Sequence, residues 1–273
     1  MFSVVIPHYN NLQLLKTGLE SIFSAEKLTR SSGSKLEIIV VDNNSTDGSR
    51  EYLEKLSRCN IGMKLDITPQ RRGEIKKKIS AERISDERSE LISNISVIYN
   101  DSNLGFSKAV NQGIKAAKYD WVVVMNNDVK VDKNWFLEIR KTVEVKKEKI
   151  GAIFGKVLNW NGEEIKSVGF DFKLKGKASH VGNNQTRVEK YSQEKIIWGA
   201  PAPVVVYRKK ALEKVDYFDK DFFAYLEDLD LAIRLRNQGW KTLYLPSAVS
   251  YHYGGKTAEK FDNFRVKYTA RNW

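Results

Sequence analysis

The sequence predicts an α/β fold in which a mostly parallel central sheet is flanked by helices. In the first half of the chain, short apolar runs alternate with segments whose apolar residues recur at helical spacing. The run at 121–125 is apolar throughout and ends abruptly in Asn126, Asn127 and Asp128. Alternating strands and helices favour a parallel sheet, and an uninterrupted apolar run of this length is typical of a strand buried on both faces.

The elements of the first half follow from these patterns in order. Apolar residues recur at helical spacing from Leu12 to Phe23, and Asn10 before them is a residue type that caps helices. Asp132 is placed in the same way before a later helix. Strands are therefore expected at 2–7, 36–41, 95–99 and 122–125, and helices at about 12–23, from the turn at 45–48 to about 56, at 106–117 and at about 132–149.

The second half has a different pattern. Residues 159–193 are rich in Gly, Asn and Lys and contain short alternating segments, which predict hairpins or loops. Asp228 opens a helical segment that ends at Gly239, a residue type favoured just after helix ends. Residues 60–93 interrupt the rhythm of the first half and predict a basic, partly helical surface insertion. Further strands are expected at 150–158, 204–207 and 242–245.

Composition limits the class of protein. With 273 residues and 41% hydrophobic content, the chain is long enough to bury a core. No apolar run approaches the roughly 18 residues that a membrane span needs, and a strand that begins at Phe2 predicts no signal peptide. Cys59 is the only cysteine, which excludes an intrachain disulfide and a cysteine-based metal cluster and fits a reducing cytoplasmic compartment.

The formal net charge of +12 has three functional interpretations: a nucleic-acid partner, an anionic membrane surface, or an acidic substrate such as a nucleotide diphosphate. The basic residues lie in separate clusters, and no recognised nucleic-acid-binding motif accompanies them. Solvated faces, in which basic residues are interleaved with acids, also explain each cluster. The sequence therefore argues against nucleic acid and leaves the other interpretations open.

Polar side chains follow four of the expected strands. A parallel sheet brings the carboxyl ends of its strands to one edge, where α/β proteins bind ligands in a cleft. At this edge Asp128 would suit a hard divalent cation that carries phosphates, and Lys108 would meet a phosphate. The alternative is a turn in which Asn127 and Asp128 cap the next helix. The four polar clusters lie at 7–10, 42–45, 103–111 and 126–128.

Three acids, Glu227, Asp228 and Asp230, open the expected helix of the second half. The helix dipole favours acids at this end, which is a purely structural explanation. A carboxylate that is kept ionised there also suits a general base. His252 follows the last strand among glycines and aromatic residues, where a second metal ligand would be useful, although a lone histidine is more often packed or exposed.

The order and spacing of these motifs resemble those of the inverting family-2 glycosyltransferases with the GT-A fold, particularly the rhamnosyltransferase-like branch. Each motif is weak alone, and together they span the chain from Val4 to about Gly255. They are Val-Val-Ile-Pro-x-Tyr-Asn at 4–10, Val-Asp-Asn-x-Ser-x-Asp-Gly-Ser at 41–49, Asn-x-Gly-Phe-x-x-x-x-Asn at 103–111, Asn-Asn-Asp at 126–128, Glu-Asp-x-Asp-Leu at 227–231 and the late His252.

The resemblance implies one GT-A domain over residues 1–255, with a Rossmann-like nucleotide-binding half at about 1–128 and an acceptor half at about 129–255. The basic insertion at about 60–93 departs from the compact family pattern. Residues 256–273 would form a basic and aromatic C-terminal extension. Because this end has no polar tail, we expect the sequence to be cut from a longer chain; a gene with a stop codon directly after Trp273 would disprove this.

The resemblance also implies a role for each motif. Asp128 and His252 would bind Mn²⁺ or Mg²⁺, although Asn126 replaces the first acid of the family's Asp-x-Asp motif, a change expected to weaken metal affinity. Asp228 would be the catalytic base, with Glu227 beside it. The nucleotide sugar would contact Pro7, Tyr9, Asn10, Asp42 and Asn44 around the base, Asn103, Lys108 and Asn111 at the ribose and diphosphate, and Asn127. The acceptor would lie above Trp198, Gly199 and Ala200.

The implied function is metal-dependent, inverting transfer of a sugar from a UDP- or dTDP-sugar to a hydroxyl of a glycan or lipid-linked acceptor. A nucleotidyltransferase is the enzymatic rival, but its usual glycine-rich loop after the first strand is absent at 7–11. The dinucleotide and P-loop fingerprints are absent as well. A non-catalytic nucleic-acid-binding protein would fit the charge and the six Trp, but it explains neither the strand that ends in Asn-Asn-Asp nor the acids at 227–230.

We expect a cytoplasmic protein. Two interpretations of the basic C-terminal residues stay open: peripheral contact with an anionic membrane face, which suits a lipid-linked acceptor, or a solvated helix. Co-sedimentation with anionic vesicles at low salt distinguishes them, because the solvated helix predicts no binding. The residues concerned are Lys256, Lys260, Arg265, Lys267 and Arg271.

Overall fold

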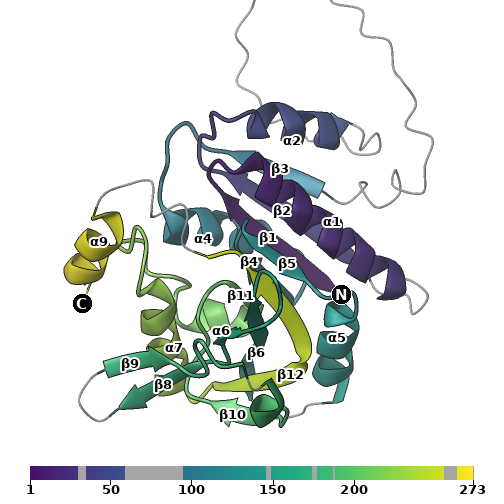
Figure 1. Ribbon diagram of the computed structural model, residues 1–273. Helices are drawn as coiled ribbons and strands as arrows, with labels where there is room; N and C mark the ends of the chain where they lie inside the picture. Colours follow the sequence, from purple (N-terminus) through teal and green to yellow (C-terminus); the bar gives the residue numbers. More distant parts are fainter. Residues whose placement is uncertain are drawn as a thin grey trace, which may run out of the picture.

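The computed structural model describes residues 1–29, 35–58, 95–145, 149–173, 177–186, 188–254 and 263–272. One ten-stranded sheet runs through the protein, with helices packed around it (Figure 1). The strand order is β10-β12-β6-β11-β4-β1-β2-β3, with β5 beside β12 and β7 beside β6. The predicted α/β fold with a central sheet and flanking helices is confirmed. The predicted insertion at 60–93 lies outside the described residues.

The first half of the chain forms the parallel part of the sheet. Strand β1 pairs in parallel with β2 and β4, and β2 with β3, so that the carboxyl ends of all four strands reach one edge. The strands are β1 (Phe2–His8), β2 (Leu36–Asp42), β3 (Ile95–Tyr99) and β4 (Trp121–Met125), and the helices between them are α1 (Leu12–Thr29), α2 (Ser49–Arg58) and α4 (Phe106–Ala116).

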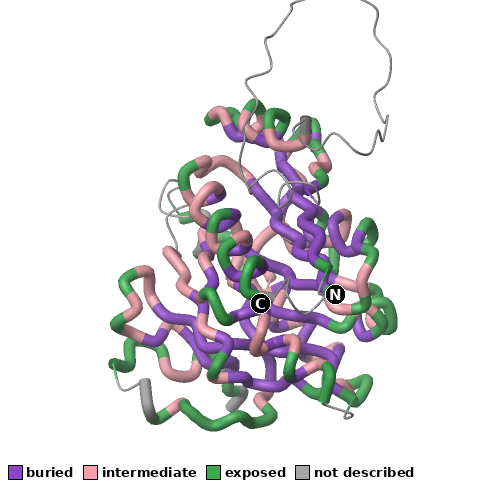
Figure 2. Tube along the Cα trace, turned by 90° about the vertical axis from the view of Figure 1, so that its right-hand side faces the viewer, coloured by how far each residue is buried: buried purple, intermediate pink, exposed green. Residues whose placement is uncertain are grey.

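Helices α1 and α4 cover opposite faces of these strands. Val5 and Val124 are register partners and share one face, where a Cβ on Gly113 of α4 would lie 2.3 Å from Val5. Met125 projects to the other face, since neighbouring strand residues alternate, and its Cε lies 3.5 Å from the Cβ position of Gly18 in α1. Strand β4 is thus buried on both faces, as its apolar run predicted, and Figure 2 shows the strands as the buried centre of the molecule.

The second half adds strands of mixed direction. Strand β11 runs antiparallel to both β4 and β6, whereas β12 is parallel to β6 and antiparallel to β10 and β5. Parallel pairing is therefore confined to β1–β4 and the β6–β12 pair. The strands are β5 (Val129–Val131), β6 (Ile150–Asn159), β7 (Ile165–Ser167), β10 (Lys195–Ile197), β11 (Val204–Arg208) and β12 (Lys241–His252), and β8 (Phe170–Lys173) with β9 (Lys177–His180) forms a separate hairpin.

Strand β12 is longer than its sequence predicted. The expected strand ended at Leu245, but pairing resumes after a register shift between Leu245 and Val249 and continues to His252. The shift lies where Gly155 of β6 approaches the carbonyl oxygen of Ala248. The remaining helices are α5 (Trp135–Val145), α6 (Lys209–Lys214), α7 (Glu227–Asn237) and α9 (Phe264–Asn272), with a 3₁₀ turn at Val188–Tyr191.

One predicted helix cap is wrong. Helix α1 begins at Leu12, whose backbone N–H donates to the Asp47 carboxylate at 2.8 Å instead of to Asn10. The Asn10 side chain accepts from the Thr46 N–H at 2.8 Å and so ties the loop after β1 to the loop after β2. A residue 35 positions away replaces the local cap, which a local sequence pattern cannot show.

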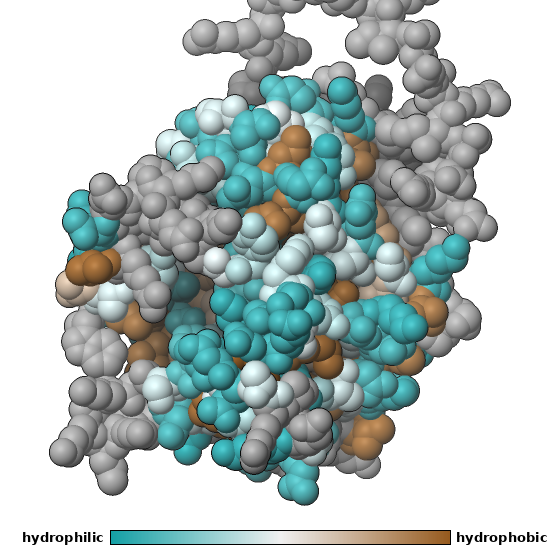
Figure 3. Space-filling view, viewed as in Figure 1, coloured by the Kyte–Doolittle hydropathy of each residue, from teal (hydrophilic) through white to brown (hydrophobic). Residues whose placement is uncertain are grey.

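The face of the molecule shown in Figure 3 is mainly hydrophilic. In the face shown in Figure 3, apolar side chains form separate small areas between polar ones. Within the described ranges, no helix is both long enough and apolar enough to span a bilayer.

Candidate active site

A cavity of about 300 Å³ opens at the edge where the parallel strands end. Six residues that the sequence singled out line it together, although they come from four separate parts of the chain. They are Pro7, Tyr9, Asn103, Asn127, Asp128 and His252. The remaining lining comes from His8, Asn43, Gly105, Phe106, Asn126 and the segment 223–225. The prediction that the strand ends share one cleft therefore agrees with the structure.

Asp128 and His252 meet at one side of this cavity. The His252 Nε2 lies 3.2 Å from the Asp128 Oδ2, and the Tyr253 N–H donates to the Asp128 carbonyl at 2.9 Å. Antiparallel pairing of β12 with β5 sets His252 opposite Val129, which directly follows Asp128. The contact thus depends on the extra length of β12 beyond its register shift.

The chemistry of these groups fits a divalent cation. A carboxylate and an imidazole adjoin, and the Asn126 Oδ1, on the same cavity lining, is buried without a hydrogen-bond partner among the described residues. Within that part of the chain no third His, Cys, Asp or Glu gathers with Asp128 and His252. Mg²⁺ and Mn²⁺ are commonly bound by few protein ligands, with phosphate oxygens and water as the others.

His8 orients Asn127 from beneath the cavity. The Asn127 amide donates to the His8 Nδ1 at 2.9 Å and to the Asn10 carbonyl at 3.0 Å. Burial lowers the pKa of His8 to about 4, although the charges of Asp42 and Asp47 act in the opposite direction. The imidazole is therefore neutral near pH 7, which lets Nδ1 accept this hydrogen bond. His8 had no role in the sequence-based prediction, because a histidine at a strand end shows neither its burial nor its partner.

Three residues that were predicted to contact the nucleotide sugar support the cavity without lining it. Asp42 is fully buried and forms an ion pair with Arg50, Oδ2 to Nε 2.9 Å. Asn44 has a left-handed backbone, φ 69°, and its side-chain oxygen lies 3.5 Å from an Arg50 nitrogen. Asn10 bonds to the loop after β2, as described above. The neighbouring Asn43 lines the cavity instead, and its amide donates to the Gly105 carbonyl at 3.1 Å.

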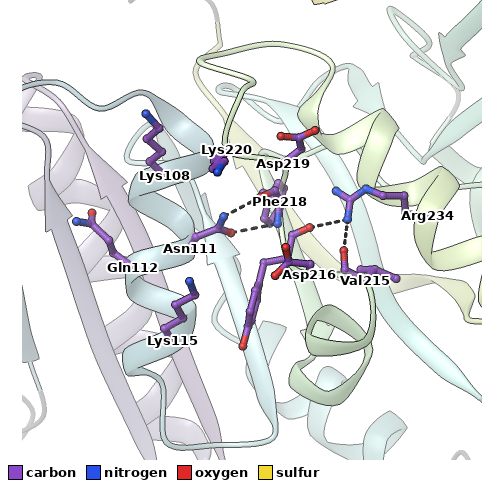
Figure 4. Close-up of a pocket in the computed structure, with 11 residues that line it drawn as sticks. Lys108, Asn111, Gln112, Lys115, Val215, Asp216, Phe218, Asp219, Lys220 and Arg234 are labelled. Atoms are coloured by element: carbon purple, nitrogen blue, oxygen red, sulfur yellow. Dashed lines mark hydrogen bonds between the residues drawn. The ribbon is translucent and has the colours of Figure 1, made fainter.

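Lys108 and Asn111 line a different cavity. It has a volume of about 520 Å³ and lies between α4 and the segment 215–220 (Figure 4). Both ends of the Asn111 amide bond to the Phe218 backbone, at 2.7 and 3.1 Å, so this side chain clamps the segment to α4. The structure therefore does not bring these two predicted diphosphate contacts together with Asp128.

Glu227 and Asp228 lie in the first turn of α7, where Glu227 is buried and Asp228 is half-buried. The Asp228 carboxylate accepts the N–H groups of Ala202 at 2.9 Å and Leu229 at 2.8 Å. Burial raises the pKa of Glu227 to about 8, the charge of Asp228 adds to this, and Glu227 Oε2 has no hydrogen-bond partner in the described chain. Burial raises the pKa of Asp228 too, but its two N–H donors oppose that. Because hydrogen bonds from backbone N–H groups favour the charged form, Asp228 ionises more readily than Glu227.

The third acid has a structural partner. Asp230 pairs with Arg234 at 2.6 Å, one helical turn along α7. Arg234 also donates to the carbonyl oxygens of Val215 and Tyr217, which fixes the loop before α7. Asp230 therefore has a structural role, which it fills through an ion pair with Arg234; the sequence had offered the helix dipole as the structural explanation of this cluster.

The predicted acceptor segment, Trp198 to Ala200, lies against α7. A Cβ on Gly199 would come within 2.6 Å of the Ala232 Cβ, so glycine permits the close approach. Two residues after Ala200, the Ala202 N–H donates to Asp228. The segment and the carboxylate that the sequence assigned to acceptor chemistry are thus neighbours.

Sequence reasoning assigned no binding role to the segment 223–225, which forms one wall of the cavity. The Phe223 carbonyl accepts the Phe106 N–H at 2.7 Å. Gly105, with φ 82°, leaves room for this contact, because a Cβ there would lie 2.6 Å from the same carbonyl oxygen. The available signal was a group of aromatic residues at 222, 223 and 225, shortly before the acids at 227–230.

Comparison with known proteins identifies the family. The model of glycosyl transferase family 2 matches residues 3–79 and 77–215. The chain belongs to this family. The family resemblance inferred from the ordered motifs is therefore confirmed.

Curated relatives match the chain over different lengths. It is 38% identical over 69 residues to an N-acetylglucosaminyl-diphospho-decaprenol L-rhamnosyltransferase of Mycobacterium tuberculosis, covering 25% of this chain and 22% of the relative. It is 22% identical over 256 residues to a poly-β-1,6-N-acetyl-D-glucosamine synthase of Staphylococcus aureus, covering 89% and 47% respectively. The chain thus spans less than half the length of either relative.

Solved structures confirm the GT-A fold. A crystal structure of GalNAc-T7 with UDP, GalNAc and Mn²⁺ superposes with a TM-score of 0.66 over 92% of this chain and 43% of that chain. The sequences are 14% identical, so the likeness is one of fold.

We predict that His8 makes the stability of the protein depend on acid pH. Because the folded pKa of about 4 lies below the unfolded value of 6.5, the unfolded state binds a proton first as the pH falls. His8 leaves the free energy of unfolding unaffected above about pH 6.5 and lowers it by roughly 3 kcal/mol in total between pH 6.5 and 4. Urea unfolding of the wild type and of His8→Gln at pH 7, 6, 5 and 4 measures the difference. Parallel losses in both proteins would show that His8 is not held neutral.

Proposed function

We propose that the protein transfers a sugar from a UDP- or dTDP-sugar to a hydroxyl of a glycan or lipid-linked acceptor, with inversion at the anomeric carbon and with a divalent metal. One observation carries the proposal: Asn103, Asn127, Asp128 and His252 line a single cavity whose wall leads directly into the helix that bears Asp228. Family membership supplies the reaction class. The nucleotide base, the sugar, the acceptor and the inversion are parts of the proposal.

The donor would lie across the ends of β1 and β4. Pro7 and Tyr9 would bound the nucleotide base, while Asp42, Asn10 and Asn44 would hold the loops that shape this end. Asp128 and His252 would bind Mn²⁺ or Mg²⁺, with the unpartnered Asn126 oxygen nearby. When bound, the metal offsets negative charge on the diphosphate leaving group. The GalNAc-T7 structure, which contains UDP and Mn²⁺, supports a role for a metal in this fold.

Asp228 would act as the general base. Two backbone N–H groups donate to its carboxylate and favour the charged form that a base needs, whereas burial raises the pKa of the neighbouring Glu227 to about 8. Asp228 would take the proton of an acceptor hydroxyl positioned over 198–200. The hydroxyl oxygen then forms a bond to the anomeric carbon as the bond to the diphosphate breaks, with its electron pair leaving on the diphosphate. Attack opposite the leaving group inverts configuration, and positioning supplies much of the acceleration.

A lipid-linked acceptor has support from one relative. The Mycobacterium tuberculosis protein is named for rhamnosyl transfer to a diphospho-decaprenol acceptor. Helix α9 exposes Lys267 and Arg271 at the described C-terminal end. Contact with an anionic membrane face at the cytoplasmic side is consistent with both observations and stays a prediction.

We predict that Asp228→Asn retains nucleotide binding but lowers transfer by a factor of roughly 10² or more, because the amide cannot accept the proton. The measurements are sugar transfer to the acceptor and nucleotide affinity by calorimetry. Asp221→Asn is the matched control, since Asp221 is an exposed acid in the loop before α7. Near-normal turnover of Asp228→Asn would remove this residue from the role of base.

We predict that Asp128→Ala weakens nucleotide binding only when metal is present. Thermal unfolding with UDP, dTDP, GDP, CMP and NAD, each with Mn²⁺ and with chelator, reports specific binding as a rise in Tm. The wild type should respond to UDP or dTDP with Mn²⁺, and the exposed control Asp101→Ala should behave alike. If Asp128→Ala weakened nucleotide binding equally with chelator and with Mn²⁺, a metal role would be excluded. A folded wild type whose Tm rises with no nucleotide would favour the alternative of a nucleic-acid-binding protein.

A further inference from the structure

Side chains of the C-terminal helix α9 contact the segment 223–225, which forms one wall of the cavity. The side-chain amide of Asn272 donates to the carbonyl oxygens of Ala224 and Tyr225, each at 2.8 Å. One helical turn earlier, the Tyr268 ring stacks on Phe223, with centroids 5.1 Å apart and planes 21° from parallel. Residues four positions apart lie on the same side of a helix, so one face of α9 makes both contacts.

The contacted segment has a costly backbone conformation. Tyr225 and Leu226 have φ of 68° and 67°, in the left-handed region that non-glycine residues rarely adopt. Two such residues in succession persist only where the surroundings impose them. Leu226 is also the residue from which α7 starts, and its side chain makes no capping hydrogen bond. The direction in which Glu227 and Asp228 leave the segment therefore depends on how 223–226 is held.

The segment is anchored at both ends. At its start, the Phe223 carbonyl accepts the Phe106 N–H of α4. At the left-handed turn itself, the two carbonyls that flank Tyr225 are those that Asn272 binds. An asparagine amide can donate to two acceptors at once, whereas an ionised aspartate donates to none. The second anchor is therefore specific for the residue type at 272.

We propose that Asn272 is a positioning residue, which holds the segment 223–226 so that it forms the cavity wall and starts α7 with Asp228 in place. Helix α9 is then a part of the site and not a separate extension. Asn272 acts through Ala224 and Tyr225 and does not touch reacting atoms. The statement about catalysis rests on the function proposed above, whereas the statement about the segment does not.

The test uses the full chain with Asn272→Ala, Asn272→Asp and the control Val266→Ala, whose side chain is exposed on the same helix. Amide hydrogen exchange is followed at 223–230 and at Phe106, whose N–H reports the first anchor. Asn272→Ala should speed exchange at 223–230 roughly tenfold, because two hydrogen bonds no longer oppose local opening. Asn272→Asp should have a larger effect, since its carboxylate repels both carbonyls. Val266→Ala, and the amides of β1 and β2 in all variants, should match the wild type.

Kinetics separate positioning from a general loss of stability. With Asn272→Ala, kcat should fall roughly tenfold while KM for the donor changes much less, because the base is misplaced more than the cavity floor. Unchanged exchange at 223–230 in both Asn272 variants would overturn the proposal, as would faster exchange with an unchanged kcat. Exchange is measured without substrate, so a wild type that transfers no sugar would refute the proposed function separately from the hydrogen-exchange result.

Discussion

The position of β4 between β1 and β11 is the constraint on which the site depends. Its residues Val122 to Val124 are completely buried, so the strand has one register against its neighbours and ends at one place. That end delivers Asn126, Asn127 and Asp128 to the edge that β1 and β2 also reach. The antiparallel strand β11 on the other side leads back to 202 and so brings the Ala202 N–H to Asp228. The two halves of the site thus share one sheet.

Buried polar groups then set the chemistry of the edge. His8 stays neutral because it is buried, and this neutral form is the one that accepts the Asn127 amide. Burial raises the pKa of both Glu227 and Asp228, and two backbone N–H groups favour the charged form of Asp228 over that of Glu227. In both places burial disfavours the charged form of a side chain, and hydrogen bonds then determine which groups that side chain contacts.

Long-range contacts hold the loops in which these groups lie. Asp47 satisfies the start of α1, Asn111 clamps Phe218, and Asn272 holds the turn before α7. Each contact joins residues far apart in sequence through a side chain that satisfies backbone groups. Loops that carry left-handed residues need such support, because this backbone conformation is unfavourable without stabilising contacts from the surroundings.

The sequence by itself determined the strands and helices around the parallel part of the sheet, the burial of β4, the gathering of Pro7, Asn103 and Asp128 at one edge, and the position of the acids at a helix start. Apolar periodicity, which is a local property of the chain, predicted the elements, and the general rule that parallel strands end at one edge of a sheet predicted the gathering. Tertiary structure alone decided that β11 runs antiparallel, that β12 continues past its register shift to bring His252 to Asp128, that Lys108 and Asn111 face another cavity, and that α9 contacts the wall of the site. All four features have the same physical reason. Each depends on which groups distant in sequence pair with one another, and local residue type and spacing do not encode that choice.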